Sequence, residues 1–155
     1  MDLEDEESYV VIELSSFMLE TLRKKNLVSL LGSIFPVHLD WHGNMENYVK
    51  AKANILQGSE TNIMFSATKS QYFSSLPVEH LVLSGKDTPY TWDGQFFYAH
   101  GRQLFALSEV KILGEHNLRN ISAVVALADV LQISDAVLVD TIANFAPVRH
   151  RLELV

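Results

Sequence analysis

The stretch LVSLLGSIFPVHLDWHGNMENYVKAKANILQGSETNIMFSA, residues 27–67, contains two short apolar runs with one helical pattern between them. The runs at 27–35 and 60–67 have the length and composition of buried strands. Residues 45–56 follow a helical pattern, and Gly58 lies just beyond it, where glycine commonly ends a helix. A strand, a helix and a second strand in this order predict two parallel strands joined by a helical crossover.

The flanking sequence continues the same alternation. YVVIEL (9–14) has the β-branched character of a strand, and residues 15–26 follow a helical pattern that a serine at its start can cap. Further along, residues 69–76 predict a short helix and residues 80–85 a fourth strand. Strands that alternate with helices predict an α/β fold with a mainly parallel sheet flanked by helices.

The pattern changes over residues 88–113, where aromatic and β-branched runs are interrupted by Asp93-Gly94 and His100-Gly101. Both dipeptides are turn signals, so this region predicts a small antiparallel β section.

Two further helices are predicted after this section, over residues 117–132 and 135–145. The first has apolar residues at three- and four-residue steps, which favours one core-facing side. These residues are Leu118, Ile121, Val125 and Ala128. Residues 149–155 predict a last strand at the very end of the sequence, so we expect the chain to be a piece of a larger protein.

The composition excludes several classes of protein. The 155 residues are 48% hydrophobic, which is enough to form a core, and the net charge of −7 argues against a nucleic-acid-binding surface. The absence of cysteine excludes disulfides, thiolate metal sites and a cysteine nucleophile. The acidic start MDLEDEES is unlike a signal peptide, and no apolar run is long enough to cross a bilayer. We therefore expect a soluble cytoplasmic protein that binds neither nucleic acid nor membrane.

A compact polar motif, His38-x-Asp40-x-His42, follows the second predicted strand. Imidazole and carboxylate groups are good ligands for zinc or another divalent cation, so the motif is compatible with a metal-dependent hydrolase. The same pattern occurs more often in an ordinary polar loop, in which Asp40 would cap a helix or turn the chain. The remaining histidines lack the spacing of a second ligand pair, so the motif alone leaves both interpretations open.

Glu13 and Lys52 have two interpretations each. Glu13 lies near the end of a predicted apolar strand, so it either faces water or forms half of a magnesium or manganese site together with His38. Lys52 shares a helical face with Tyr48 and Ile55. It therefore either extends its amine to water or is a desolvated lysine with a lowered pKa, available for chemistry.

Polar residues at the start of the long helix and near the end of the sequence could bind a nucleotide. Asn117 is a candidate N-cap, whereas Asn120 on the same face has no capping role, and a pair of amides there could hold the edge of a nucleobase. The cluster Arg149-His150-Arg151 could bind phosphate or be a solvated charge cluster.

Four blocks stand out in their order along the chain: ELSSFMLE (13–20), HLDWHGNMENYVKAKANIL (38–56), GEHNLRNISAVVALADVL (114–131) and HRLELV (150–155). Together they resemble the Mur ligases, and the resemblance extends over nearly the whole chain. ELSSF followed by LE is the most discriminating block, because it is similar to the branch of the family that adds D-glutamate. The other blocks are shared more widely in the family.

The resemblance implies an incomplete P-loop NTPase-like central domain of an ATP-dependent, amide-forming ligase. Such enzymes use ATP and Mg²⁺ to convert the carboxylate of UDP-N-acetylmuramoyl-L-alanine into an acyl phosphate. The amine of D-glutamate then attacks the acyl phosphate, in a step of peptidoglycan precursor synthesis. We expect the enzyme to act in the cytoplasm as a monomer.

The resemblance also implies a metal-binding role for three residues. Glu13 and His38 resemble ligands of two magnesium ions near the ATP phosphates. Lys52 resembles the lysine that becomes carbamylated in this family, which would turn a cation into a small carboxylate able to orient a metal.

Five other residues match positions that contact substrate or nucleotide in the family. Ser15 is similar to a contact to the muramoyl substrate, and Asn117 and Asn120 match positions near the adenine. His150 and Arg151 match the hinge into the third domain and its approach to the nucleotide.

The sequence departs from the family pattern at four positions. Val37 stands where an Asp usually precedes the histidine, and Ser33 where an Asn is common. Met18 replaces a Gln that contacts substrate, and Arg149 replaces a Pro or Glu. These departures affect substrate contacts and loop geometry more than the metal ligands.

The phosphate-binding loop GxxGKT/S, which precedes ELSSF in the family, is absent from the sequence. We therefore expect residues 1–148 to be a partial central domain without this loop and residues 149–155 to begin the C-terminal domain. On this basis the chain alone is expected to be inactive, and its parent to be an active ligase. The alternatives are a non-catalytic or diverged binding piece, or a divalent-metal-dependent hydrolase.

Overall fold

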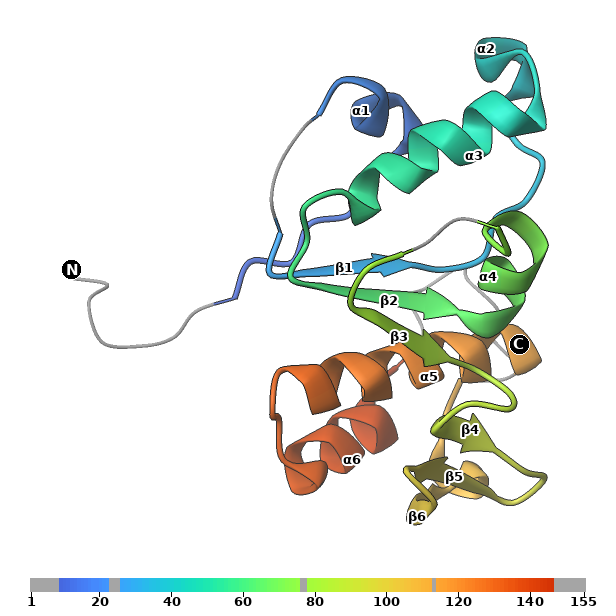
Figure 1. Ribbon diagram of the computed structural model, residues 1–155. Helices are drawn as coiled ribbons and strands as arrows, with labels where there is room; N and C mark the ends of the chain where they lie inside the picture. The colour runs from blue at the N-terminus through green and yellow to red at the C-terminus, as the bar shows by residue number, and fades with distance from the viewer. Residues whose placement is uncertain (1–8, 23–25, 76–77, 113, 147–155) are drawn as a thin grey trace, which may run out of the picture.

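A three-stranded parallel sheet lies at the centre of the fold (Figure 1). The computed structural model describes residues 9–22, 26–75, 78–112 and 114–146. The strands are β1 (Val28–Leu31), β2 (Thr61–Phe65) and β3 (Leu81–Ser84), in the order β1-β2-β3. Both strand pairs are parallel, which confirms the predicted α/β architecture.

Helices cover both faces of this sheet, as Figure 1 shows. One face is covered by α3 (Met45–Ala53), the 3₁₀ turn η1 (Asn54–Leu56) and α4 (Ser66–Tyr72). α1 (Ser16–Thr21) and α2 (Leu39–His42) pack against α3. The other face packs against α5 (Glu115–Val130), with α6 (Asp135–Asn144) beside it. Two-sided burial is the usual state of a parallel sheet, because crossover helices lie on its faces.

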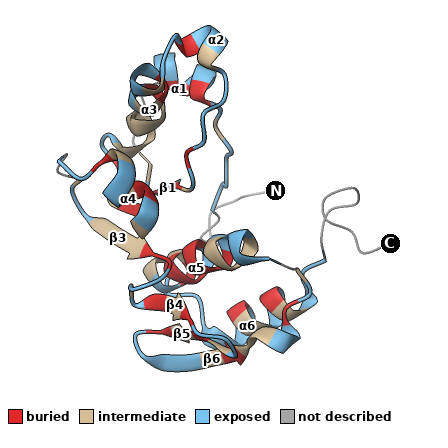
Figure 2. Ribbon diagram, turned by 90° about the vertical axis from the view of Figure 1, so that its right-hand side faces the viewer, coloured by how far each residue is buried: buried red, intermediate tan, exposed pale blue. Residues whose placement is uncertain are grey.

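The central strand β2 divides the hydrophobic core into two clusters. Ile63 and Phe65 belong to the cluster on the α5 side, and Met64 between them belongs to the cluster with α3. All three side chains are buried, because successive residues of a strand point to opposite faces and both faces are covered. Figure 2 shows that much of α5, which contacts both the parallel sheet and β4, is buried.

A small antiparallel sheet follows, as predicted for residues 88–113. Its strands are β4 (Tyr90–Trp92), β5 (Phe96–Ala99) and β6 (Arg102–Ala106), followed by the 3₁₀ turn η2 (Leu107–Glu109). At the first turn, Asp93 Oδ1 accepts the backbone N–H groups of Gln95 and Phe96 at 2.7 and 2.8 Å. The carboxylate therefore fixes the turn that the Asp-Gly pair indicated.

The prediction of a strand at 9–14 is wrong. Residues 9–15 are extended without forming a strand, and Val10 and Val11 are 82% and 89% exposed. A β-branched run becomes a strand only where a neighbouring strand completes its hydrogen bonds, and this run pairs with none of the described strands. The sequence pattern of residues 9–14 shows a propensity for β structure, but it does not show whether a neighbouring strand is available to pair with.

The boundaries of α1, α4 and α5 also differ from the predictions. α4 spans Ser66–Tyr72, where residues 69–76 were expected. α1 ends at Thr21, where residue 26 was expected. The strand predicted at 149–155 lies outside the described residues. α5 begins at Glu115, so the prediction of Asn117 as its N-cap is wrong. Gly114 is the N-cap, with a φ of 96° that favours glycine, and a Cβ there would lie 2.7 Å from the ring of His116.

A hydrogen-bonded group joins the antiparallel sheet to α5. The hydroxyl of the buried Tyr90 donates to Asp129 Oδ2 at 2.6 Å, and His100 Nε2 lies 3.1 Å from the same oxygen. The hydrogen bond from Tyr90, with His100 and Arg102 nearby, holds the pKa of Asp129 below its usual value. The carboxylate is therefore more stable ionised in the folded chain than in the unfolded chain.

We predict that Asp129→Asn lowers the free energy of unfolding by about 1 kcal/mol at neutral pH, the value of one hydrogen bond to a partly solvated carboxylate. Because the folded pKa is lowered, this contribution is present above the unfolded pKa of about 3.9 and is lost as pH falls through the folded pKa. Urea unfolding across acidic and neutral pH measures both effects. Tyr90→Phe removes the same hydrogen bond and keeps the ring. If Tyr90 and Asp129 interact, the double variant should lose less stability than the sum of the two single variants. Fully additive losses of unfolding free energy would contradict the contact.

Candidate functional site

Four of the predicted site residues lie on or next to α1, α2 and α3, which pack together on one face of the sheet. Glu13 is exposed in the extended chain before α1, and Ser15 is the N-cap of that helix. His38 is the residue that enters α2, and Lys52 lies in the last turn of α3. Neighbouring elements therefore supply these residues, although Glu13 lies in none of the described strands, contrary to the prediction from sequence.

Ser15 has a structural role at the start of α1. Its Oγ accepts the backbone N–H of Met18 at 3.2 Å, and its backbone is extended, with φ −73° and ψ 161°. This is the geometry of a serine N-cap, which satisfies an N–H group that the helix itself leaves without a partner. The hydroxyl remains at an exposed position, so capping does not bury it.

His38 occupies a strained backbone position at the entrance to α2. Its φ of 56° and ψ of 31° lie in the left-handed region, which few residues other than glycine adopt. Its carbonyl accepts the N–H groups of Trp41 and His42 at 3.2 and 3.0 Å, and its exposed ring lies 5.0 Å from the ring of Phe17. Such strain persists only where surrounding contacts enforce it, and it is common at functional sites.

His42 is a residue whose role the sequence did not reveal. Its side chain is 1% exposed, and it lies between two residues of α1. Nε2 is 3.0 Å from Ser16 Oγ, and Nδ1 is 3.0 Å from Glu20 Oε1, the second contact lacking the alignment of a good hydrogen bond. The motif interpretation assigned His42 to an ordinary loop, whereas the structure buries it in a polar network.

The available sequence signal for this network was the spacing on α1. Ser16 and Glu20 are four residues apart, so they lie on one face of a helix and can both reach a third group. The partner, His42, is 26 residues from Ser16 along the chain, and no local pattern links the two.

Lys52 is half-buried on α3, next to the buried Ala51 and one turn from the buried Tyr48. This agrees with the predicted placement of Lys52 beside apolar residues.

Asn117 and Asn120 lie in the first turns of α5, which covers the opposite face of the sheet from α3. The structure therefore separates the asparagines from the cluster of α1, α2 and α3, and His150 and Arg151 lie outside the described residues.

Within the described part of the chain, no three or more His, Cys, Asp or Glu side chains come close enough to hold a metal ion. The motif His38-x-Asp40-x-His42 illustrates why. His42 points into the α1–α2 interface, while His38 and Asp40 are exposed. The three side chains thus do not form the ligand set that a metal-dependent hydrolase would need.

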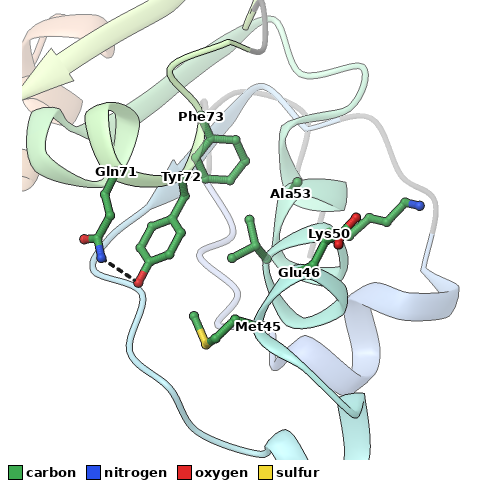
Figure 3. A pocket seen from close by; sticks show the side chains of 8 residues that line it. Met45, Glu46, Lys50, Ala53, Gln71, Tyr72 and Phe73 are labelled. Carbon is green, nitrogen blue, oxygen red and sulfur yellow. Dashed lines mark hydrogen bonds between the residues drawn. The ribbon is translucent and has the colours of Figure 1, made fainter.

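A hollow between α3 and α4 has a volume of about 410 Å³. Figure 3 shows that its wall is mainly apolar and that the amide of Gln71 donates to the hydroxyl of Tyr72 at its rim. The lining residues are Met45, Glu46, Val49, Lys50, Ala53, Gln71, Tyr72 and Phe73. It contains none of the predicted site residues, so it is separate from the candidate site.

Comparison with protein families gives a direct match to this architecture. The model of the Mur ligase middle domain matches residues 1–128. The chain belongs to the Mur ligase family. This confirms the family resemblance and the fold expected from it.

Mur ligases of several bacteria are similar to this chain over most of its length. UDP-N-acetylmuramoylalanine–D-glutamate ligase of Streptococcus agalactiae serotype III (strain NEM316) is 30% identical, in a match that covers 96% of this chain and 35% of the relative. The enzyme of the same name from Geobacillus kaustophilus (strain HTA426) is 32% identical over 95% of this chain and 35% of its own length. The chain thus spans about a third of the length of the curated relatives it matches.

A relative named for a different amino acid and a solved structure extend the comparison. UDP-N-acetylmuramoyl-L-alanine–L-glutamate ligase of Xanthomonas axonopodis pv. citri (strain 306) is 28% identical over 95% of this chain and 32% of its own length. The structure of a UDP-N-acetylmuramoyl-L-alanyl-D-glutamate–2,6-diaminopimelate ligase matches with a TM-score of 0.64 at 20% identity, covering 92% of this chain and 33% of that chain. At this identity the structural match supports the Mur ligase fold alone.

The departures from the Mur ligase pattern lie on the surface. Met18 and Val37 are 49% and 44% exposed, and Ser33 is exposed as well. They therefore leave the core of the family fold unchanged, while Arg149 lies outside the described residues.

Among the helices that the structure describes, none has the length and apolar character needed to cross a bilayer.

Ser15 offers a test of the helix cap at this site. We predict that Ser15→Ala lowers the free energy of unfolding by about 1 kcal/mol, because the N–H of Met18 loses its acceptor, and that Ser15→Asn restores most of the loss. Chemical denaturation measures both. Ser134 caps α6 in the same way, so Ser134→Ala is a matched control away from the site. A cost for Ser134→Ala with none for Ser15→Ala would contradict the cap at Ser15.

Proposed function

We propose that this chain is the central part of an ATP-dependent ligase that adds D-glutamate to UDP-N-acetylmuramoyl-L-alanine. The observation that carries the proposal is the similarity to UDP-N-acetylmuramoylalanine–D-glutamate ligases along nearly the whole chain, at about 30% identity. The reaction would activate the alanyl carboxylate as an acyl phosphate, and the amine of D-glutamate would displace phosphate. ATP use and nucleotide-linked substrates make the cytoplasm the expected location.

In domain terms, we propose that residues 1–148 are a partial central domain and residues 149–155 the start of the C-terminal domain. The central domain would lack its phosphate-binding loop, so the rest of the parent protein would supply that loop. Asn117 and Asn120 are proposed to contact the adenine, because both lie in the first turns of α5 and a side-chain amide can donate to and accept from the edge of a nucleobase. His150 and Arg151 are proposed to approach the nucleotide from the hinge.

The residues of this chain are compatible with Mg²⁺ bound mainly through phosphate. Magnesium commonly keeps several waters and takes only one or two protein ligands when it binds nucleotide phosphates, so a cage of three protein side chains is not required. Glu13 and His38 are both exposed and supply a carboxylate and an imidazole from neighbouring elements. When bound, magnesium would neutralise charge on the transferred phosphoryl group.

Lys52 is proposed to become carbamylated. A lysine at this half-buried place beside Tyr48 would otherwise add a positive charge to a metal-binding region, whereas its carbamate is a carboxylate-like acceptor that can orient a cation. A mass gain of one CO₂ on the peptide that contains Lys52 would support this modification.

Ser15 is proposed to bind the muramoyl substrate with the hydroxyl that also caps α1. The hydroxyl oxygen accepts from Met18, and its hydrogen remains available to donate to a substrate oxygen. Ser15→Ala would then raise the KM for the muramoyl substrate, whereas Ser134→Ala, with a similar capping loss, would not.

The stereochemistry of the amino acid defines a second candidate. The Xanthomonas relative that is 28% identical is named for L-glutamate, so the central region alone is compatible with either enantiomer. Residues that select the amino acid are expected in another part of the parent protein. L-Glutamate is therefore included in the test below.

The deciding experiment measures phosphate release by the complete reading frame that contains this chain. The assay contains ATP, Mg²⁺, UDP-N-acetylmuramoyl-L-alanine and D-glutamate, with each organic substrate omitted in turn and L-glutamate replacing the D-enantiomer in one series. Release that requires both substrates is expected, with none from the present chain by itself. A folded full-length protein that releases phosphate with neither enantiomer would reject the ligase proposal and favour a diverged, non-catalytic relative.

A pair of histidine variants separates chemistry from fold. We predict that His38→Asn lowers kcat of the full-length enzyme by about 100-fold or more, because a metal contact worth several kcal/mol is lost. Asparagine tolerates the left-handed backbone, so stability should stay within about 1 kcal/mol of the parent protein. His80 is also exposed and left-handed, with a φ of 49°, so His80→Asn is a matched control. Equal activities for the two variants would exclude His38 from the site.

A further inference from the structure

The polar network around His42 joins α1 to α2 at a buried point. Ser16 is 2% exposed and His42 is 5% exposed, whereas the side chain of Glu20 is 38% exposed. Ser16 Oγ and Glu20 Oε1 each lie 3.0 Å from a different nitrogen of the His42 ring. Both ends of the ring are thus held by α1, which fixes the orientation of the imidazole.

The chemistry of the partners assigns the hydrogen on the ring. An ionised carboxylate accepts hydrogen bonds but donates none, so the 3.0 Å approach of Glu20 Oε1 favours the tautomer with hydrogen on Nδ1, even though the contact lacks the alignment of a good hydrogen bond. In the neutral ring Nε2 is then an acceptor, and the hydroxyl of Ser16 donates to it. The order serine, histidine, carboxylate is therefore the same as in a nucleophile–base–carboxylate triad.

Burial excludes nucleophilic catalysis by this triad. A nucleophile must meet its substrate, and the 2% exposure of Ser16 leaves no approach to its Oγ. A buried polar network in that setting acts by fixing geometry. The relevant question is which part of the molecule it fixes.

Further contacts between the same two helices show what is held. Glu20 Oε2 accepts the indole N–H of Trp41 at 3.3 Å, so the carboxylate contacts two successive residues of α2. The ring of Phe17 lies 5.0 to 5.6 Å from the rings of His38, Trp41 and His42. Helices of four and six residues are too short to be stable alone, so these contacts are what maintain both.

His38 depends on α2 through its backbone. The N–H groups of Trp41 and His42 bond to its carbonyl, and they hold it in the left-handed conformation only while α2 is intact. On the other side, the amide of Asn47 donates to the carbonyl of His42 at 2.9 Å and ties α2 to the start of α3. His42 thus lies at the junction of the three helices that supply the candidate site.

We propose that His42, held between Ser16 and Glu20, is a positioning residue that fixes His38 relative to Ser15 and Glu13. Its imidazole makes no contact with substrate or metal and acts through α1 and α2. The inference rests on the proposed function only in taking His38 as a metal ligand. The network itself is independent of which substrate the enzyme uses.

The first test measures metal affinity of the full-length protein, with Mn²⁺ as a spectroscopic replacement for Mg²⁺ and ATP present. Glu20→Gln and Ser16→Ala are each expected to weaken Mn²⁺ binding by about tenfold, the usual size of effects from groups that orient a ligand without touching the metal. The Mg²⁺ concentration for half-maximal activity should rise by the same factor, while kcat at saturating Mg²⁺ stays near the parent value. A lost ligand would instead lower kcat at every Mg²⁺ concentration.

A matched control separates positioning from general loss of stability. Asp135, half-exposed at the start of α6, forms an ion pair with Arg102 far along the chain from the candidate site. Asp135→Asn removes a comparable carboxylate and should leave Mn²⁺ affinity unchanged. If Glu20→Gln and Asp135→Asn alter Mn²⁺ affinity equally, or if the parent protein binds no Mn²⁺ in the presence of ATP, the inference is overturned.

The second test observes the ring directly by ¹⁵N NMR of the histidine side chains, at about pH 8.5, two units above the ordinary histidine pKa. Hydrogen on Nδ1 of His42 is expected, with loss of this preference in Glu20→Gln. A ring with hydrogen on Nε2 alone would contradict the assignment. A full-length protein that releases no phosphate but shows the expected Mn²⁺ and NMR effects would reject the proposed ligase and retain the positioning role.

Discussion

Burial of the central strand β2 on both faces is the constraint on which the rest of the structure depends. Ile63 and Phe65 are covered by α5, and Met64 by the cluster that includes Phe73 beside α3. β2 is buried in this way because its neighbours run parallel to it and the helical crossovers that join parallel strands return the chain over the faces of the sheet. The placement of α3 and α4 on one face, and α5 on the other, follows from this requirement.

The candidate site is built on two short helices, α1 and α2, which are stabilised by the side-chain contacts between them. α1 and α2 have too few residues to be stable alone. The side chains of Phe17 and Glu20 in α1 contact α2, including the buried His42, and these contacts stabilise both helices. This arrangement gives exposed residues such as His38 a defined position without embedding them in the core. A site that must meet phosphate and water needs both properties, because its ligands have to be accessible and already oriented.

Much of the parallel sheet and the antiparallel section could be predicted from sequence, because their signals are local. The helical pattern at 45–56 and the turn at Asp93 depend only on residues a few places apart. The strand expected at 9–14 failed because a strand needs a neighbour that local composition does not specify. The network around His42 was missed for the same physical reason, since its partners are brought together by packing of α1 on α2.

The exposed stretch at residues 9–12 has a consequence for solubility. Tyr9, Val10, Val11 and Ile12 are 52–89% exposed, so extended, β-branched side chains face water next to a sheet whose β1 edge is free among the described strands. Such a segment favours intermolecular strand addition, the first step of β-aggregation. In the sequence it is preceded by the acidic run EDEE, and like charges beside an apolar segment oppose the approach of a second copy. An exposed apolar segment and an acidic run that opposes self-association therefore adjoin each other in the sequence.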